Sequence, residues 1–415
     1  MSFSAQSPPD VTGDDDLPVP LLSPANGFDG PLTDPIAAQE LATRLAVGSG
    51  PVALDAERAS GYRYSQRAYL VQLRRADVGT VLLDPIALGD LEILDPALAA
   101  AEWVLHAAGQ DLPCLAEIGI RPRSLFDTEL AGRLAGLPRV GLGPLVEQML
   151  GLSLQKGHGA DDWSKRPLPD SWLVYAALDV EVLVELRDAM EGLLRQQGKL
   201  DWARQEFAAL TGAPEPTPRI DPWRRTSGMH KIRERRGLAV VRELWTERDR
   251  IARRRDIAPH RILPDSAISE AASARPATAV ELTKLAVFGG RTPRRQADTW
   301  MAAIARAAGL PDSDLPPLHL PADGPPAPGR WAAKDPVAHA RLTAARSGLA
   351  ELAEKVGMPV ENLVTPDLVR RILWEPPDPA DVADRLRSGG AREWQIELTS
   401  PIVAAAITPA PDPSP

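Results

Sequence analysis

Two acidic residues, Asp55 and Glu57, stand two positions apart at the end of the apolar run Pro51-Val-Ala-Leu54. If this run is a buried strand, both side chains point to the same face of the sheet, because side chains alternate along a strand. Two neighbouring carboxylates near a core repel one another and resist desolvation, and a bound divalent cation would remove both penalties. Taken alone, the pair favours a simpler alternative, a strand that ends at Leu54 and leaves both acids in solvent.

Further acids lie where a sheet and a helix could bring them to the same place. Asp111 follows the strand candidate at 103–106, at its junction with a helix. Tyr175 and Asp179 have i, i+4 spacing in an amphipathic helix, which places the phenol and the carboxylate on one face. Four carboxylates and a tyrosine that converge on one sheet edge can hold two hard cations about 4 Å apart. We therefore predict a metal centre made of Asp55, Glu57, Asp111 and Asp179, with Tyr175 beside it.

The composition of the 415-residue chain excludes several classes of protein. With 44% hydrophobic residues it can form a core. Its lone cysteine, Cys114, excludes an internal disulfide and favours a reducing compartment. No apolar run approaches the ~20 residues of a membrane helix, and the first residues lack the pattern of a secretory signal. Gly198-Lys199 is followed by Leu200 instead of Ser or Thr, so no nucleotide cofactor is expected. We expect a cytoplasmic protein with no membrane partner.

Charge is distributed unevenly along the chain. The net charge is −9, but residues 219–255 carry thirteen Lys and Arg against five Asp and Glu. Lys231, Arg235 and Arg236 lie near the start of this basic segment and are candidate contacts to an RNA backbone. A solvated face is the alternative, and the arginines at 253–255 could instead end a helix.

Patterns along the chain predict an α/β domain with a mixed sheet. Strand candidates at 51–55, 69–73 and 80–84 have short connections, which is typical of an antiparallel meander. Helices and strands then alternate, which favours a mixed sheet. Residues 1–36 are rich in Pro, Asp, Ser and Gly without periodicity, and they predict a disordered acidic tail.

Two helical modules are predicted after the α/β domain. Helical patterns fill about 228–308 and 337–408, and the eight prolines of residues 311–336 predict a linker between them. A weak repeat relates the two stretches at a constant offset of 100: Pro259, Leu263 and Ile268 recur as Pro359, Leu363 and Leu368.

Taken in order, Asp55-x-Glu57, Asp111 and Tyr175-x3-Asp179 resemble the motifs of the DEDD exonuclease superfamily, in its tyrosine-containing branch. The surrounding sequence is similar to ribonuclease D, and the stretch at about 228–308 is similar to an HRDC domain. The segments that carry the ribonuclease D resemblance are Leu82-Leu-Asp-Pro85, His106 with Gln110, Phe126-Asp-Thr128, and Asp162-Trp163 with Arg166-Pro-Leu168. Two departures are visible: Ala56 stands where the family often has Thr, and residues 58–65 are unusually rich in Arg and Tyr.

The resemblance implies an α/β, ribonuclease H-like mixed-sheet exonuclease domain followed by two small all-helical HRDC-type domains. The expected division is a disordered acidic tail at 1–36, the exonuclease domain at 37–215, an HRDC domain at 216–310, a Pro-rich linker at 311–336, a second HRDC-like domain at 337–408 and a disordered tail at 409–415.

The resemblance also implies a 3′→5′ exoribonuclease that uses two Mg²⁺ or Mn²⁺ ions and acts on RNA with a free 3′ end, with transfer-RNA precursors as the expected substrates. Asp55 would bridge both ions, Glu57 and Asp179 would hold the ion of the attacking water, Asp111 would hold the other, and Tyr175 would orient that water. A DNA 3′→5′ exonuclease would share these ligands, and a non-catalytic RNA-binding scaffold would share the fold.

Other polar residues near these motifs are expected to have supporting roles. His106 is predicted to pack at the strand end instead of acting as a base, Asp127 to cap a helix, and Cys114 to lie in the core. Candidate nucleic-acid contacts in this domain are Gln110, Trp163, Lys165 and Arg166. For Trp163, packing under a loop is an equal alternative.

Overall fold

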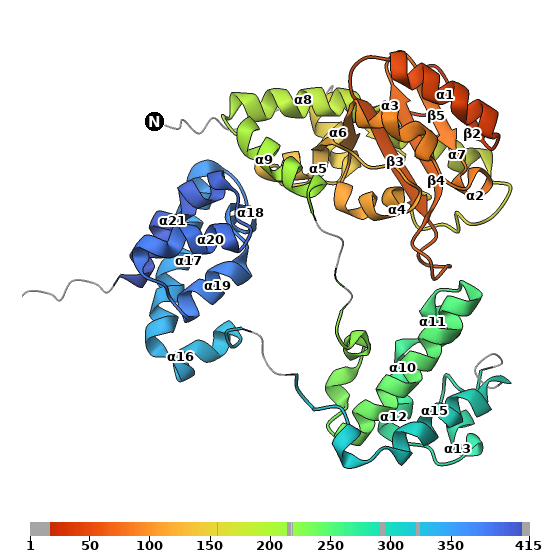
Figure 1. The fold of residues 1–415 in the computed structure, drawn as a ribbon, viewed down its shortest axis with the longest axis vertical. Helices are drawn as coiled ribbons and strands as arrows, with labels where there is room; N and C mark the ends of the chain where they lie inside the picture. The colour runs from red at the N-terminus through yellow and green to blue at the C-terminus, as the bar shows by residue number, and fades with distance from the viewer. Residues whose placement is uncertain are drawn as a thin grey trace, which may run out of the picture.

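The computed structural model describes residues 17–155, 157–213, 217, 219–290, 295–320 and 324–408. Figure 1 shows an α/β domain followed by two groups of helices, as the sequence predicts. Residues 1–16 of the predicted N-terminal tail and the predicted C-terminal tail at 409–415 lie outside the described residues. Among the described helices, none combines the length and the apolar character needed to cross a membrane.

The α/β domain is built on a six-stranded mixed sheet with the order β2-β5-β4-β3-β6-β7. β3, β4 and β5 form the predicted antiparallel meander, whereas β6 runs parallel to β3 and β7 parallel to β6. The strands are β2 Asp29–Leu32, β3 Val52–Arg58, β4 Ala68–Arg75, β5 Gly79–Leu83, β6 Glu102–Leu105 and β7 Ser124–Asp127. A separate pair joins β1 Val19–Leu21 to β8 Leu152–Leu154.

Strand β3 lies between β4 and β6, and its two faces differ in chemistry. Val52, Leu54 and Ala56 enter the main hydrophobic core. The intervening residues, including Asp55 and Glu57, face helix α7 Asp170–Glu181, which covers the opposite face of β3, β4 and β5. The strand continues to Arg58, so the alternative of a strand that ends at Leu54 is wrong.

The prediction of disorder was wrong for residues 17–36. They contain β1 and β2, and α1 Pro35–Val47 begins after Asp34, whose side chain caps the helix by accepting the Ile36 N–H. A Cβ on Gly30 would lie 2.3 Å from the Leu82 carbonyl oxygen, so only glycine fits there. Strand pairing uses the backbone, and it therefore needs no apolar periodicity in the added strand.

The remaining helices of the α/β domain surround this sheet. They are α2 Pro85–Leu88, α3 Asp95–Ala99, α4 Leu112–Glu117, α5 Thr128–Leu134, α6 Leu142–Leu150, α8 Leu183–Gln196 and α9 Leu200–Thr211. The first helical module, residues 222–309, contains α10 Arg235–Arg255, α11 Pro259–Ile262, α12 Asp265–Ala274, α13 Ala279–Thr283 and α15 Ala297–Gly309. The second helical module, residues 331–407, contains α16 Trp331–Lys334, α17 Pro336–Val356, α18 Val360–Leu363, α19 Pro366–Trp374, α20 Val382–Ser388 and α21 Glu393–Ile407.

The repeat predicted from the sequence corresponds to a structural repeat. The part of each module that takes part in the repeat begins with a helix of 21 residues, which is α10 in the first module and α17 in the second. A four-residue helix follows, α11 or α18, and then α12 or α19. Leu263 and Leu363 are both fully buried at equivalent places. The two modules therefore share one arrangement of helices.

The Pro-rich stretch at 311–336 is anchored where it meets each module. Leu315 is buried in the core of the first module, and Trp331 is fully buried in the core of the second. Single apolar side chains in a segment rich in proline are enough to attach its ends, although they make no periodic pattern.

The second module shares the main core of the α/β domain. Trp394 stacks on Trp202 with ring centroids 4.9 Å apart, and its indole N–H donates to Glu206 Oε1 at 3.1 Å. Met358 and Leu363 enter the same core. This contact is apolar and buried, so it joins the second module to the α/β domain as one body.

Trp394→Ala is expected to lower the free energy of unfolding of this body by about 3–5 kcal/mol, the usual cost of deleting a buried aromatic side chain. The shift of the urea midpoint, followed by circular dichroism, measures the loss. Trp245→Ala removes a half-buried ring of the first module and is expected to cost less. Equal losses in the two variants would contradict the shared core.

Candidate active site

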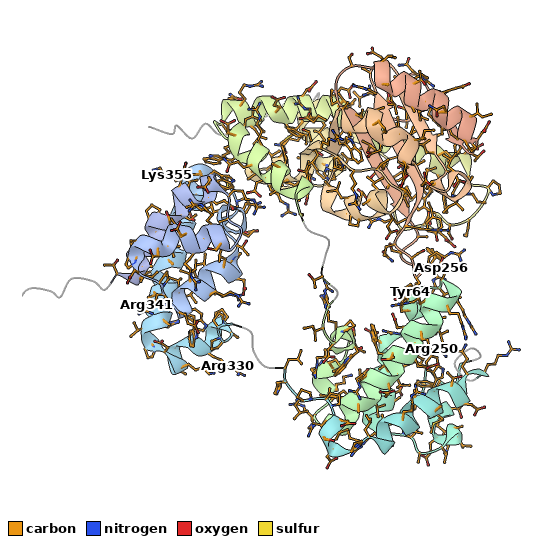
Figure 2. All side chains as sticks on the ribbon, in the orientation of Figure 1. Tyr64, Arg250, Asp256, Arg330, Arg341 and Lys355 are labelled. Carbon is orange, nitrogen blue, oxygen red and sulfur yellow. The ribbon has the colours of Figure 1, made fainter. Side chains whose placement is uncertain are left out.

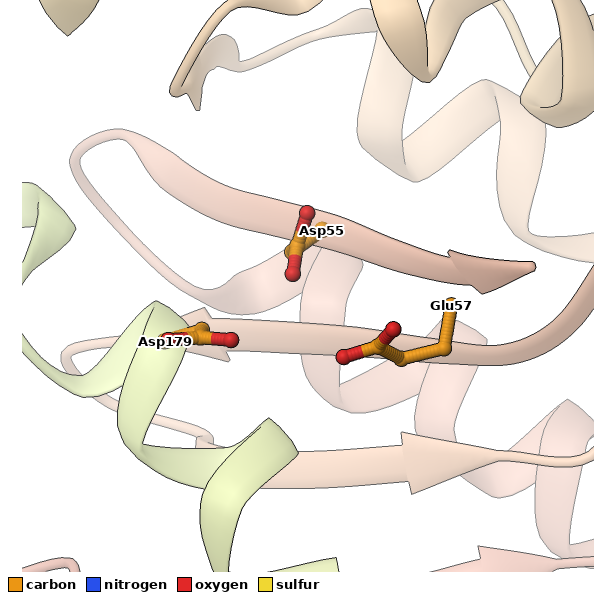
Figure 3. A group of neighbouring side chains, drawn as sticks. All are labelled: Asp55, Glu57 and Asp179. Carbon is orange, nitrogen blue, oxygen red and sulfur yellow. The ribbon is translucent and has the colours of Figure 1, made fainter. Parts of the chain in front are cut away.

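Three carboxylates from two elements meet on the sheet face that α7 covers. One carboxylate oxygen each from Asp55, Glu57 and Asp179 lies within 4.8 Å of the others. Figure 3 shows the three side chains turned toward a common space between β3 and the helix. The strand places two of them on one face, and the helix supplies the third.

The fourth predicted acid and the tyrosine lie at the edge of this group. Asp111 stands at the N-cap position of α4, just after the 3₁₀ turn Ala108–Gln110, and its carboxyl group hydrogen-bonds to that of Asp55. It also lies 3.5 Å from Arg58 Nη2. The Tyr175 hydroxyl hydrogen-bonds to Asp179. The structure thus brings all five predicted residues together.

Burial and crowding perturb the protonation of these acids. Burial, followed by the charges of the neighbouring carboxylates, raises the pKa of Glu57 to about 10. Burial, followed by the charge of Asp55, raises the pKa of Asp111 to about 8 and that of Asp179 well above its usual value. Burial also raises the pKa of Asp55. Each of the four carboxylates is therefore harder to ionise than a free carboxyl group, and nearby positive charge would favour the ionised forms. Hard oxygen donors of this kind fit divalent Mg²⁺ or Mn²⁺.

Two residues beside the group support it without belonging to it. His106 Nδ1 lies 2.9 Å from Thr128 Oγ1, and burial lowers its pKa to about 4, which leaves the ring uncharged. Asp127 caps α5 as predicted, and it also accepts the backbone N–H groups of Ala107 and Ala108 at 3.1 and 2.9 Å. Asp127 therefore holds the turn that presents Asp111, a role that its sequence position did not indicate.

A cavity of about 390 Å³ opens onto the group. Asp55, Tyr175 and Asp179 line it together with Arg139 and Gln155, which the motifs did not single out. Its volume lies within the usual range of small-molecule sites, about 300–1,000 Å³. Arg139 is 71% exposed and could meet an anionic ligand at the opening. Neither residue belongs to a spaced motif, so the sequence contained no signal for them.

Two predicted nucleic-acid contacts have structural roles. Trp163 is fully buried, and its indole N–H donates to the His158 carbonyl at 3.0 Å, so the prediction of base stacking was wrong. The Arg166 guanidinium donates to both oxygens of Asp84 at 2.6 and 2.8 Å and to the Tyr69 carbonyl at 2.7 Å. Both side chains hold the segment before α7, Trp163 from within the core and Arg166 through hydrogen bonds while it stays partly exposed. Contact of Arg166 with nucleic acid stays a prediction.

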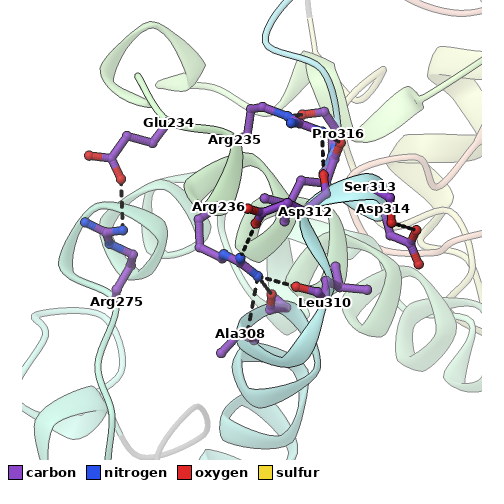
Figure 4. Close-up of polar contacts among 12 residues, drawn as sticks. Glu234, Arg235, Arg236, Arg275, Ala308, Leu310, Asp312, Ser313, Asp314 and Pro316 are labelled. Carbon is purple, nitrogen blue, oxygen red and sulfur yellow. Dashed lines mark hydrogen bonds and ion pairs between the residues drawn. The ribbon is translucent and has the colours of Figure 1, made fainter.

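Arg235 and Arg236 also bind within the protein, as Figure 4 shows. Arg235 donates to the carbonyls of Asp312, Leu315 and Pro316. Arg236 donates to the Leu310 carbonyl at 2.6 Å and pairs with a carboxylate of Asp312 at 2.8 Å. The end of α15 and the Pro-rich segment leave carbonyls without helical partners, and these arginines satisfy them. Most of their guanidinium donors are engaged within the protein, but Arg235 remains exposed, and contact of this pair with RNA stays a prediction.

The other predicted contacts lie on the surface. Gln110, Lys165 and Lys231 are exposed, and their contact with nucleic acid stays a prediction. Cys114 is buried in the main core, as expected.

Comparisons with known proteins agree with this arrangement. Family models match residues 31–195 (3′-5′ exonuclease), 237–304 (HRDC domain) and 324–407 (3′ to 5′ exonuclease C-terminal domain). Ribonuclease D of Granulibacter bethesdensis is 34% identical over 279 residues, covering 64% of this chain and 69% of that protein. Ribonuclease D of Acidiphilium cryptum is 33% identical over 308 residues, covering 71% and 76%.

Two solved structures resemble the whole chain. A protein from Bifidobacterium adolescentis is 37% identical with a TM-score of 0.87, covering 94% of this chain and 99% of that one. Escherichia coli RNase D, 24% identical with a TM-score of 0.65, covers 91% and 97% and supports the fold. The sequence relatives, with the match to the exonuclease model, show that the chain belongs to the ribonuclease D family of 3′→5′ exoribonucleases.

Proposed function

We propose that this chain removes nucleotides from the free 3′ end of RNA with two divalent ions, Mg²⁺ or Mn²⁺, in the exonuclease domain predicted at 37–215. The observation that carries the proposal is the convergence of Asp55, Glu57 and Asp179 within 4.8 Å on a buried face, with Asp111 hydrogen-bonded to Asp55. Such a group is strongly destabilised unless cations neutralise it.

The positions of the acids suggest how they would share the ions. Asp55 lies next to both Asp111 and the Glu57–Asp179 pair, so it would contact both ions. Glu57 and Asp179 would hold one ion, and Asp111 would hold the other. When bound, a pair of such ions lowers the pKa of the attacking water and neutralises charge on the leaving 3′ oxygen.

Tyr175 would orient the attacking water. Burial, followed by the charges of Asp179 and Glu57, raises the pKa of the phenol, so its hydroxyl stays protonated at neutral pH. A protonated phenol donates and accepts hydrogen bonds but does not remove a proton. We therefore assign Tyr175 a positioning part in hydrolysis and no part as a base.

The substrate assignment follows from the family. The relatives are named ribonuclease D, and E. coli RNase D is described as an exoribonuclease involved in structured RNA processing. We propose RNA with a free 3′ end as the substrate of this chain, with transfer-RNA precursors as the physiological form. A cytoplasmic location, which the lone cysteine favours, belongs to the same proposal.

Cleavage of 5′-labelled single-stranded RNA and of DNA of equal sequence, with Mg²⁺ or with chelator, tests the proposal. RNA should shorten stepwise from its 3′ end, and chelation should lower the rate about 10³-fold or more, because bound metal contributes several kcal/mol to catalysis. Circular RNA is the control and should resist cleavage. Equal cleavage of DNA would overturn the RNA assignment, and no cleavage with either metal would favour a binding scaffold.

A further inference from the structure

The loop between β3 and β4, residues 59–67, links the metal centre to the first helical module. We call it the β3–β4 loop. It begins two residues after Glu57, and its aromatic and cationic residues are Tyr62, Arg63, Tyr64 and Arg67. Figure 2 shows Tyr64 of this loop beside Asp256 at the end of α10.

Asp256 binds the backbone of this loop. Its Oδ1 accepts the N–H groups of Tyr64 at 3.1 Å and Ser65 at 2.9 Å, and its Oδ2 accepts the Tyr69 hydroxyl at 3.4 Å. The residue caps the C-terminus of α10 with a left-handed backbone, φ 47°, while its own N–H bonds to the Ala252 carbonyl. The helix end therefore fixes the residue whose carboxylate receives the loop.

Side chains of the loop complete the contact. The Tyr64 hydroxyl donates to Asp249 Oδ1 at 3.0 Å and accepts from Arg253 Nη2 at 3.1 Å. Its ring packs against the core of the first module. Arg261 adds a hydrogen bond to the Gly61 carbonyl at 2.7 Å. Between them, these groups hold the loop at several points along its length.

The same loop contacts the segment that precedes α7. Arg63 Nε donates to Ser164 Oγ at 2.7 Å. Tyr69, which also touches Asp256, packs in one small cluster with Trp163 and Tyr175. The contact of the first module thus continues to α7 through side chains, and the loop itself follows β3 directly along the chain.

The end of β3 is the place where such support matters. The register between β3 and β4 shifts between Glu57 and Arg58: Glu57 pairs with Leu70 and Arg58 with Ala68, so Tyr69 is the extra residue of a bulge at the end of the ladder. Glu57 belongs to the carboxylate group, and Arg58 lies 3.5 Å from Asp111. The β3–β4 loop begins directly after Arg58 and this bulge, so a loop that is held in place supports the direction of both side chains.

The first module is also attached differently from the second. The second module shares a buried apolar core with the α/β domain, whereas the first has a separate core and meets the domain here through hydrogen bonds and the packing of the Tyr64 ring. A single substitution can weaken a polar contact of this kind without opening a core.

We propose that Asp256 is a positioning residue for the metal centre: by holding the β3–β4 loop, it fixes the end of β3 that carries Glu57 and Arg58. The proposal rests on the metal-dependent function above. The first helical module is then part of the machinery that assembles the site, in addition to any contact with RNA. Loss of the contact should weaken metal binding even where the substrate is too short to reach the module.

Asp256→Asn removes the charge that receives the loop, and Tyr64→Phe breaks the hydroxyl bonds while keeping the ring. Both should raise the Mg²⁺ concentration needed for half-maximal cleavage of a trinucleotide about tenfold. This is the smaller end of the loss of metal affinity expected when a group that orients metal ligands is removed. The rate at saturating Mg²⁺ should stay within about twofold of wild type, since the ligands themselves are intact. Asp298→Asn, an exposed aspartate in the first turn of α15, is the matched control and should change neither value.

Two measurements without RNA separate this proposal from the proposed function. Calorimetric Mn²⁺ binding should weaken in Asp256→Asn by the same factor as the Mg²⁺ requirement rises, and amide exchange in residues 59–67 should become faster. Unchanged Mn²⁺ affinity in folded Asp256→Asn and Tyr64→Phe, with thermal midpoints equal to wild type, would overturn the positioning role. Failure of wild type to cleave RNA would instead refute the proposed function, and Mn²⁺ binding would still report on Asp256.

Discussion

Asp55→Asn is expected to lower the rate of RNA hydrolysis by about 10⁴-fold or more, because metal catalysis contributes several kcal/mol and each 1.36 kcal/mol is a factor of ten. Asp55 is the residue that lies next to every other acid of the site, so its charge would be shared by both ions. Asparagine keeps the size of the side chain but provides a neutral oxygen that holds cations weakly. Asp179→Asn is expected to have an effect of the same kind.

Single-turnover cleavage of 5′-labelled RNA measures the loss, and fluorescence anisotropy measures RNA binding. Binding should remain measurable, since the exposed surface of the domain is unchanged. Asp170→Asn, an exposed aspartate in the first turn of α7, is the matched control and should retain the wild-type rate. If Asp55→Asn kept most of its activity, the assigned metal-binding role would be refuted.

Tyr175→Phe is expected to slow hydrolysis about 100-fold, the lower end of the effect of a group positioned for proton transfer. The phenylalanine ring can keep its place in the cluster with Trp163 and Tyr69, so only the hydroxyl and its bond to Asp179 are lost. Because no metal ligand is removed, Mn²⁺ affinity should stay near the wild-type value.

The rate at saturating RNA and Mg²⁺, together with calorimetric Mn²⁺ binding, separates the two effects. Tyr62→Phe is the matched control, because the substitution keeps both contacts of Tyr62 with the first module, the ring under Arg261 and the backbone carbonyl that accepts the Ala258 N–H. A wild-type rate in Tyr175→Phe would remove this hydroxyl from the mechanism. Equal slowing in Tyr62→Phe would point to a general disturbance of the domain.

Much of the site could be predicted because its spacing is local. The alternation of side chains along a strand places Asp55 and Glu57 on one face, and the helical turn places Tyr175 above Asp179. The cap at Asp127 has the same origin, since an acid before a helix accepts the free N–H groups of its first turn. The repeat of Pro259 and Leu263 at Pro359 and Leu363 likewise reflects local helix boundaries.

What the sequence did not predict concerns groups whose partners are distant in the sequence. Trp163, Arg166, Arg235 and Arg236 have the residue types of nucleic-acid contacts, but each one satisfies or fills part of the fold. A carbonyl or carboxylate is left without a hydrogen-bond partner only as a result of how segments far apart in the sequence pack together. The strand at 29–32 was missed for the same reason, because β5 supplies its backbone partners.

The sequence by itself therefore determined the order and spacing of the acids, the tyrosine and the helical modules. It acts through side-chain directions that repeat every two residues in a strand and every 3.6 residues in a helix, so only nearby positions are involved. Only the tertiary structure decided that β3 extends past Glu57, that Asp111 reaches Asp55, and that the β3–β4 loop meets Asp256. These contacts join elements brought together by chain folding, and their energies depend on desolvation and on which polar groups remain unpaired, which no local pattern records.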